Sequence, residues 1–289
     1  MESIIKIQNL NYKVDEKFLL RDISLDIQAG ETFAILGSNG AGKSTLIDQI
    51  TGDLSPSSGS LEYPKHQNLK TFKNNLGIVY DSTPFYPMLK VKEILNLFGR
   101  IYGIRYQDRM DLIEQLQLTE IMNRLFSKLS KGERKKVGLF IAFCHEPAVI
   151  MLDEPTGELD PLMRDKLWKS VFKKQENRCL IFSTHHWEEA YKYADRIAFI
   201  SKGMLVGDIL SKSDISAKID GKKVIISKQA IDPHADSRIA ETQFSQDEAN
   251  YYFYPEQQHE KEFINLITQH TLNFSIEEKS LEDYYKAHI

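Results

Sequence analysis

The sequence predicts an α/β protein built around a parallel β-sheet. Three short apolar runs carry this prediction: TFAIL at 32–36, AVIML at 148–152 and CLIFS at 179–183. Each run has the length and composition of a buried strand. Helical patterns separate the runs, and apolar strands that alternate with helices indicate a parallel sheet covered on both faces.

Composition allows a folded core and argues against some partners. The chain has 289 residues, of which 42% are hydrophobic and 27% are charged. Its 37 basic and 41 acidic residues give a net charge of −4, so no overall field draws it to nucleic acid or anionic lipid. We therefore expect its partners to be selected by local sites.

The cysteines and the lengths of the apolar runs indicate the cellular compartment in which we expect the protein to work. Cys144 and Cys179 both lie in apolar stretches, which favours reduced core thiols of an intracellular protein over a disulfide framework. The start ESIIKIQNL lacks the apolar core of a signal peptide, and the longest apolar run, Val137 to Cys144, is too short to span a bilayer. We expect any membrane role to come through another chain.

The N-terminal elements follow in order. Residues 4–14 and 18–27 alternate in polarity and predict a strand pair. The strand TFAIL then runs into a glycine-rich loop and a helix that begins near Gly42. Residues 86–145 are mostly helical by period, most clearly in VKEILNLFGRIYGI and DLIEQLQLTEIM.

The second half ends in a separate region. RIAFISKGMLVGDI predicts a hairpin that turns at Lys202 and Gly203. Beyond about residue 211 the composition changes, and residues 228–249 are polar with little pattern. YYFYP, HEKEFINLITQ, LNFSI and the capped helix SLEDYYKAHI then predict a small α+β appendage. We expect one domain over residues 1–211 and an accessory α+β region over residues 212–289.

LSKGERKKV, residues 129–137, combines a helix start with glycine and positive charge. Ser130 and Glu133 have the spacing of a capping box, in which each side chain bonds the other residue's amide. One interpretation is an ordinary buried helix with Lys135 and Lys136 on a solvated face. The other is an anion site, because a helix start offers amides and positive potential.

A phosphate-binding loop is predicted at residues 37–45. GSNGAGKST matches G-x-x-x-x-G-K-[ST] between a buried strand and a helix. Lys43 would reach the outer phosphates, Ser44 would bind Mg²⁺ and Thr45 would lie nearest the inner phosphate. The alternative is a merely tight turn. The loop residues are Gly37, Ser38, Asn39, Gly40, Ala41, Gly42, Lys43, Ser44 and Thr45.

Polar residues follow two of the buried strands. Asp153 ends one strand, where an acid orders the Mg²⁺ shell opposite Ser44, and Glu154 beside it can orient and polarise an attacking water. The alternative is a solvated strand end. His185 follows another strand, where it can contact a terminal phosphate, and His186 is the spare candidate.

With these pieces in order, residues 3–210 resemble the ATP-binding subunit of an ABC transporter. GSNGAGKST, LSKGE, MLDEP, the LD pair at 159–160 and STH occur in the family's order. The resemblance implies a P-loop NTPase fold with a RecA-like core, an antiparallel β subdomain and a helical subdomain over about residues 86–145. Tyr12 matches the aromatic that stacks on adenine, with Phe18 as its rival.

The resemblance also implies partners and a cycle. Two nucleotide-binding subunits, identical or different, face head to tail, and LSKGE of one would cap ATP in the phosphate loop of the other. Ser130, Gly132, Glu133 and Asp160 would then meet the partner's nucleotide. ATP and Mg²⁺ are the implied cofactors, membrane-spanning permease subunits the implied partners, and the cytoplasmic face of the cell membrane the implied location.

Three positions depart from the family pattern. Asp81 stands where the family usually has glutamine and could still approach Mg²⁺, although its charge would repel the terminal phosphate. Lys131 and Glu133 replace a glycine and a glutamine, and Glu158 replaces a small residue. Because Glu154 is retained, we expect a competent ATPase.

The run LKVKEILNLFGRIYG and the C-terminal SLEDYYKAHI resemble ABC-2-type exporters. The acidic residue after LGIVY resembles subunits of lantibiotic and other peptide exporters, among which phenol-soluble modulin exporters are the system we favour. The alternatives are a soluble ABC ATPase of the cluster-assembly type and a regulatory module that binds ATP with little turnover. The ERKK run could contact nucleic acid, but the near-neutral charge argues against it.

Overall fold

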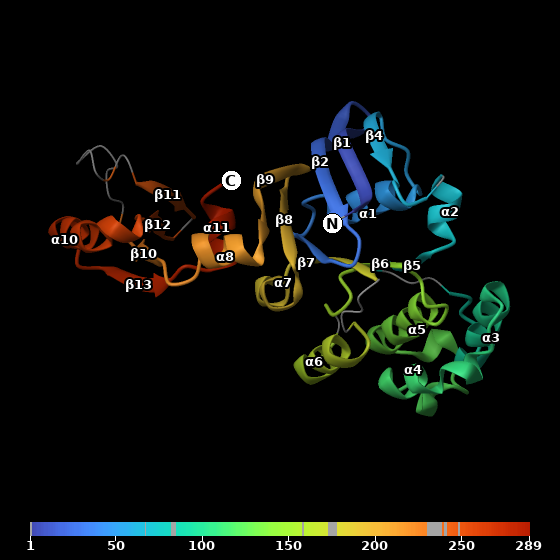
Figure 1. Ribbon diagram of the computed structural model, residues 1–289. Helices are drawn as coiled ribbons and strands as arrows, with labels where there is room; N and C mark the ends of the chain where they lie inside the picture. Colours follow the sequence, from blue (N-terminus) through green and yellow to red (C-terminus); the bar gives the residue numbers. More distant parts are fainter. Residues whose placement is uncertain are drawn as a thin grey trace. The chain divides into compact units, whose positions relative to one another are not determined.

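The computed structural model divides the chain into two compact units, Met1–Leu205 (unit 1) and Val206–Ile289 (unit 2) (Figure 1). The structure describes residues 2–66, 68–81, 85–157, 159–172, 178–229, 239, 242–247 and 249–289. None of the helices in these ranges combines the length and apolar character needed to cross a bilayer.

Unit 1 opens with a three-stranded antiparallel sheet. β1 (Ser3–Val14) lies between β2 (Lys17–Gln28) and β4 (Ser58–Glu62). The β1–β2 pairing confirms the predicted strand pair. Inward-facing residues such as Leu10 and Leu20 are fully buried, so the alternation seen in the sequence reflects one packed face.

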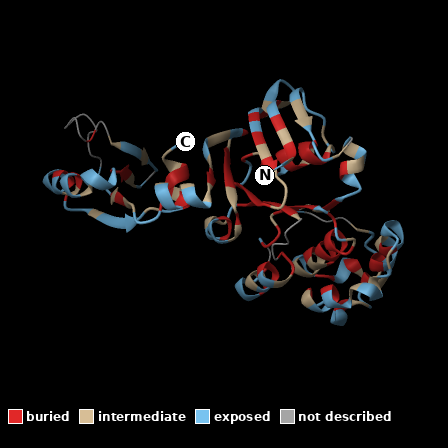
Figure 2. Cartoon of the chain, viewed as in Figure 1, coloured by how far each residue is buried: buried red, intermediate tan, exposed pale blue. Residues whose placement is uncertain are grey.

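The predicted parallel sheet forms the centre of unit 1. Its strands lie in the order β5, β6, β7, β3, β8, β9, and the pairs from β5 to β8 are parallel. Every residue of β3, β6 and β7 is buried (Figure 2), which explains their continuous apolar sequences. The bounds are β3 Thr32–Leu36, β5 Leu76–Val79, β6 Val149–Asp153, β7 Cys179–Thr184, β8 Arg196–Ser201 and β9 Met204–Ser211.

Helices cover both faces of this sheet. α1 (Lys43–Thr51) lies on the side of β1 and β2, and α7 (Trp187–Tyr193) lies on the other side (Figure 1). α1 contacts β2 and β6, whereas α7 contacts β3 and β7. α2 (Leu69–Lys73) precedes β5, and α6 (Pro161–Ser170) follows β6.

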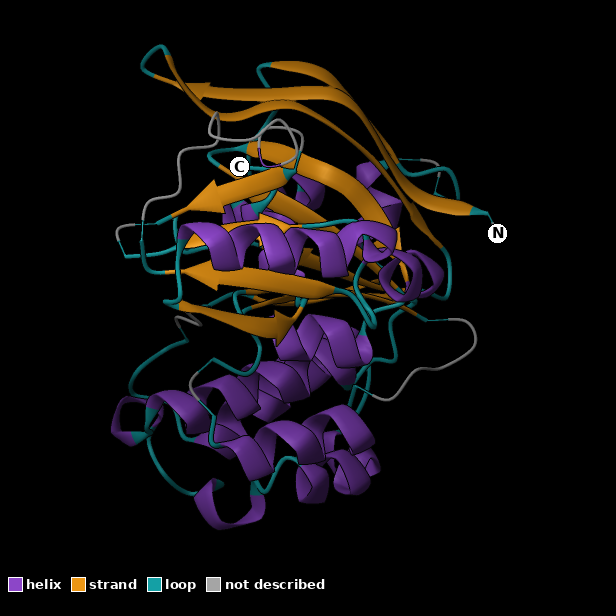
Figure 3. Ribbon diagram, turned by 90° about the vertical axis from the view of Figure 1, so that its left-hand side faces the viewer, coloured by secondary structure: helices purple, strands orange, loops and turns teal. Residues whose placement is uncertain are grey.

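The segment predicted to be helical forms a group of helices beside the strands (Figure 3). Its members are α3 Val91–Tyr102, η1 Tyr106–Arg109, α4 Met110–Gln115, η2 Thr119–Ile121, η3 Phe126–Lys128 and α5 Lys131–Phe143. DLIEQLQLTEIM was predicted to be an amphipathic helical segment, but it is divided between α4 and η2 and does not form one continuous helix. Gln117 adopts a φ of 55°, a left-handed conformation that ends α4.

Unit 2 contains strands and helices, and it begins at Val206, whereas the accessory region was predicted from residue 212. Its sheet has the order β11, β12, β10, β13 with antiparallel pairs, and Phe263 and Ile267 of α10 pack on Phe253 and Ile225 of the sheet. β10 and β11 were not predicted from the sequence. The bounds are α8 Lys212–Lys218, β10 Lys223–Ser227, β11 Gln243–Gln246, β12 Tyr251–Tyr254, η4 Gln257–His259, α10 Glu260–His270, β13 Phe274–Glu278 and α11 Leu281–Lys286.

Two local predictions are also confirmed. Cys144 and Cys179 are buried free thiols, and burial raises the pKa of the Cys144 thiol to about 11. The hairpin between β8 and β9 turns at Lys202 and Gly203, which have φ values of 48° and 77°, as a two-residue turn of this kind requires.

Candidate active site

The predicted phosphate loop connects β3 to α1, and its path depends on glycine. Gly42 has a φ of 110°, a region that residues with a Cβ atom rarely adopt. A Cβ atom on Gly37 would lie 2.3 Å from the carbonyl oxygen of Ile200 in β8. The loop therefore passes close to the neighbouring strand before it enters the helix.

The start of α1 suits an anion. Gly42 is its N-cap, no side chain caps it, and its first turn contains no acidic residue. The amides and positive dipole end of such a helix start favour negatively charged groups. Ser44 is exposed and Thr45 is half-buried in this first turn.

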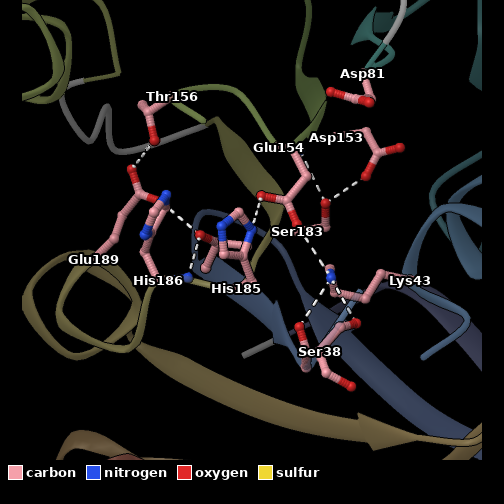
Figure 4. A network of polar contacts seen from close by, with 12 residues as sticks. Ser38, Lys43, Asp81, Asp153, Glu154, Thr156, Ser183, His185, His186 and Glu189 are labelled. Atoms are coloured by element: carbon pink, nitrogen blue, oxygen red, sulfur yellow. Dashed lines mark hydrogen bonds and ion pairs between the residues drawn. The ribbon is translucent and has the colours of Figure 1, made fainter. Parts of the chain in front are cut away.

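Lys43 is held inside the loop. Its Nζ atom donates to the carbonyl oxygens of Gly37 at 2.9 Å and Ser38 at 3.1 Å. The same atom lies 3.1 Å from Oε1 of Glu154 (Figure 4). The lysine side chain is only 6% exposed, so its charge is paired within the site.

Glu154 connects Lys43 to His185. Its other carboxylate oxygen, Oε2, lies 2.9 Å from Nδ1 of His185 (Figure 4). The Glu154 backbone has a φ of 46°, and its amide donates to the Ser183 hydroxyl at 3.0 Å. Left-handed backbone at a non-glycine residue is costly and clusters at active sites. Glu154 therefore contacts both of the other residues proposed as catalytic, Lys43 and His185.

The spare candidate, His186, takes a different position. Its ring lies 4.1 Å from that of His185, centroid to centroid. Burial, together with the neighbouring His185, lowers the pKa of His186. The hydrogen bond to Glu154 is made by His185, whereas the Glu154 charge only opposes the lowering of the His186 pKa.

The oxygen groups proposed for Mg²⁺ come from three segments. Asp153 is 3% exposed and accepts a hydrogen bond from Ser183, its register partner on β7. Asp81 is 65% exposed after β5. Within the described ranges, no three His, Cys, Asp or Glu side chains are placed to hold a metal together. A hydroxyl and two carboxylates fit Mg²⁺ shared with phosphate oxygens and water.

Lys135 corrects the sequence interpretation. It was expected on a solvated face, but its side chain is 3% exposed. Its Nζ atom donates to the carbonyl oxygens of Tyr80, Asp81 and Asp153 at 3.1–3.2 Å and lies 3.7 Å from Oδ1 of Asp81. Burial lowers the pKa of Lys135, and the carboxylate of Asp81 opposes that shift.

The LSKGE residues lie at a second place. Ser130 is the N-cap of α5, and the predicted capping box with Glu133 is confirmed: Glu133 N donates to Ser130 Oγ and Ser130 N to Glu133 Oε2. A pocket of about 400 Å³ is lined by Ser130, Gly132, Glu133 and Asp160, and by no phosphate-loop residue. One chain thus carries the predicted site residues in two separate groups.

The adenine candidates lie on the first hairpin. Tyr12 of β1 is half-buried and pairs with Leu20 of β2, and Leu20 packs near Gly42. Phe18 has the charged groups of Lys13 and Arg21 over its ring, at 4.4 and 4.6 Å from its centroid. Glu158, the third departure, lies outside the described residues.

Sequence reasoning missed three polar residues that organise the site. Ser183 contacts Asp153 at the end of β6 and the next residue, Glu154. Lys135 joins α5 to the ends of β5 and β6, and Glu189 accepts three buried hydrogen bonds. Ser183 could have been found, since it stands two residues before His185 in STHH. Nothing in the local sequence separates Lys135 or Glu189 from an ordinary surface charge.

Known proteins resemble this chain in sequence and in fold. A family model described as ABC transporter matches residues 20–157. The chain is 29% identical to the linearmycin resistance ATP-binding protein LnrL of Bacillus subtilis (strain 168) over 230 residues, which is 77% of this chain and 74% of that protein.

Larger proteins also match. The human ATP-binding cassette sub-family A member 2 is 35% identical over 201 residues, which is 67% of this chain but only 8% of that protein's length. A solved ATP-binding subunit of an ABC transporter has a TM-score of 0.67 and 26% identity, covering 74% of this chain and 92% of that one.

Proposed function

Because the chain contains an ATP-binding domain of the ABC transporter family, we propose that it is the ATP-hydrolysing subunit of an ABC exporter. One observation supports hydrolysis more than any other. Glu154 reaches Lys43 with one oxygen and His185 with the other, beside the phosphate loop. That arrangement sets a carboxylate between two groups that can face a terminal phosphate.

In this proposal each residue has one task. Glu154 accepts the proton of a water molecule whose oxygen attacks the γ-phosphorus, while the bond to the bridging oxygen breaks and ADP leaves. Lys43 stabilises charge on the phosphoryl oxygens. His185 contacts the γ-phosphate from the end of β7, and the ring's bond to Glu154 orients the carboxylate.

Ser44, Asp81 and Asp153 are the residues proposed to hold Mg²⁺. When bound, Mg²⁺ supplies charge neutralisation on the phosphate oxygens. Ser183 orients Asp153 by donating to its carboxylate. Tyr12 is the proposed adenine contact from β1.

A second copy or a related subunit completes the site in this proposal. Ser130 and Gly132 at the start of α5, with Asp160 beside them, form a surface that can cap a phosphate held elsewhere. ATP that bridges two subunits favours the closed pair only by its extra affinity for that state.

We further propose that the partners are membrane-spanning permease subunits and that the chain is peripheral on the cytoplasmic face. Similarity to a protein named for linearmycin resistance supports export, since removing a compound from the cell can provide resistance. ABC-2-type organisation and peptide or other amphipathic cargo are our proposals within that class.

The proposal is tested by hydrolysis in wild type and in Glu154→Gln, with Glu188→Gln as an exposed control near the site. We expect wild-type turnover, a loss of about 100-fold or more in Glu154→Gln, and little change in the control. Equal near-zero single-turnover rates in wild type and Glu154→Gln would instead support a regulatory ATP-binding module.

The transport part has its own test. The chain is purified with the products of its neighbouring genes, and its ATPase rate is measured with and without any membrane protein that copurifies. We expect a multi-helix membrane protein that changes the rate. Recovery of soluble partners alone would favour the cluster-assembly class.

A further inference from the structure

Glu189 is a buried acid to which the proposed hydrolysis mechanism assigns no role. It lies on α7 and is 3% exposed. Its Oε1 atom accepts from the Thr156 hydroxyl at 2.6 Å (Figure 4). The same atom accepts from the Trp168 indole at 2.7 Å, and the Oε2 atom accepts from the Thr184 hydroxyl at 2.8 Å. Three separate segments therefore meet at one carboxylate.

Each of these partners is connected to a proposed site residue. Thr184 is the last residue of β7, directly before His185, and its hydroxyl also accepts from the His186 amide at 3.0 Å. This fixes the backbone on both sides of His185. The carboxylate thus orients the Thr184 hydroxyl, which in turn holds the turn that presents the histidine.

The other two partners lie on either side of Asp160 in the sequence. Thr156 follows Glu154 by two residues, and Trp168 lies on α6, whose N-cap is Asp160. Asp160 starts that helix by accepting from the Met163 amide at 2.9 Å. Glu189 therefore contacts the chain on both sides of Asp160.

The chemistry of the cluster favours a single arrangement. A carboxylate offers only acceptors, and the two hydroxyls and the indole each present a donor hydrogen. Trp168 is further fixed by stacking on Tyr193 at 4.3 Å with an angle of 6° between the rings. A buried polar cluster with every donor satisfied is rigid, and it positions what it touches.

We propose that Glu189 is a positioning residue that holds His185 and Asp160 in fixed relation for ATP hydrolysis. This inference rests on the proposed ATPase function and adds a residue outside the phosphate loop and strand-end acids. His185 faces the nucleotide of its own chain, and Asp160 faces that of the partner. Glu189 thus joins the two nucleotide sites within one subunit.

The first test replaces Glu189 by glutamine. The amide keeps the size of the side chain but turns one acceptor into a donor, so one partner hydroxyl must reverse its bond. Glu188→Gln removes a neighbouring exposed charge from the same helix and serves as the matched control. Steady-state kcat and KM for ATP are measured for both variants.

We expect kcat to fall about 10- to 100-fold in Glu189→Gln, with KM for ATP within about twofold of wild type. The control should keep both values. Thr184→Ser, which keeps the hydroxyl, should retain most of the activity, whereas Thr184→Val should lose it as Glu189→Gln does. A purely structural role predicts no such split between kcat and KM.

Folding is checked in the same variants. Trp168 and Trp187 are the two tryptophans, so a Trp187→Phe background isolates the emission of Trp168 beside the carboxylate. We expect thermal unfolding and this emission to stay close to wild type in Glu189→Gln. Loss of activity only in parallel with unfolding would overturn the positioning role.

The outcomes separate this inference from the proposed function. Wild-type hydrolysis with an unchanged kcat in Glu189→Gln would overturn the inference alone. A wild-type chain that does not hydrolyse ATP would overturn both. Equal losses of kcat in Glu188→Gln and Glu189→Gln would indicate an effect of the net charge of α7 and would also overturn the inference.

Discussion

Nδ1 of His185 lies 2.9 Å from Oε2 of Glu154. This contact follows from the sheet, because β6 and β7 are parallel neighbours and Asp153 and Ser183 are register partners. The residues that follow each strand therefore emerge side by side at the same edge. Two segments that are 31 residues apart in sequence are brought together by one strand pairing.

His185→Ala should lower ATP hydrolysis by about 100-fold, the size expected for losing one polar contact to a reacting phosphate. His186→Ala is the matched control, because the hydrogen bond to Glu154 is made by His185. Phosphate release under saturating ATP measures both. An equal loss in the two variants would contradict the assignment of His185.

Lys43→Ala should weaken ATP binding and abolish turnover, because Lys43 carries the charge inside the phosphate loop. Binding of a fluorescent ATP analogue and steady-state hydrolysis measure the two effects. Lys70→Ala, on α2, is the control and should match wild type. If Lys43→Ala kept the wild-type affinity for the ATP analogue, the result would contradict the assignment of the phosphate loop as the nucleotide site.

Lys135→Met should destabilise unit 1 by about 2–4 kcal/mol, since three buried carbonyl oxygens lose their donor. We also expect lower hydrolysis, because Asp81 and Asp153 lose their common anchor. Urea unfolding and turnover are the measurements. Lys136→Met changes the next residue of the same helix, whose Nζ atom donates to the exposed Gln117 side chain, and should cost far less.

Ser130→Ala separates a capping role from a role in ATP binding. Losing an N-cap serine costs about 1 kcal/mol, and Ser280→Ala at the N-cap of α11 should cost a similar amount. Only Ser130→Ala should reduce the dimer formed with trapped ATP, measured by size exclusion. If both variants dimerise alike, Ser130 acts as a cap and nothing more.

Phe253→Ala should destabilise unit 2 by about 3–5 kcal/mol, because the ring is fully buried between strand and helix side chains. Phe244→Ala removes a neighbouring ring that is 40% exposed and should cost much less. Guanidinium unfolding followed by circular dichroism measures both. Similar midpoints for the two variants would contradict the core assigned to unit 2.

The elements that the sequence predicted well are those with strong local signals. TFAIL, AVIML and CLIFS are buried strands because they are mostly apolar. Gly42 of GSNGAGKST has a φ of 110°, which residues with a Cβ atom rarely adopt. The capping box at Ser130 was readable for the same reason, since its two residues are three apart.

The predictions that failed concern residues whose positions depend on contacts with distant parts of the sequence. Lys135 lies in a run of charges, and only the ends of β5 and β6 make it a buried residue. Glu189 follows another glutamate at a helix start, and its three donors come from three other segments. DLIEQLQLTEIM kept a helical period past the point where Gln117 turns the chain. Periodicity does not report such tertiary contacts.

The separation of the Ser130 pocket from the phosphate loop has a kinetic consequence. If catalysis needs one group from each of two molecules, a lone molecule holds two incomplete halves. Specific activity then rises with enzyme concentration and falls on dilution. In a pair that contains one chain without Lys43, only the site that uses the wild-type phosphate loop remains complete. At low protein concentration and saturating ATP, the rate of hydrolysis would therefore depend on the square of the protein concentration.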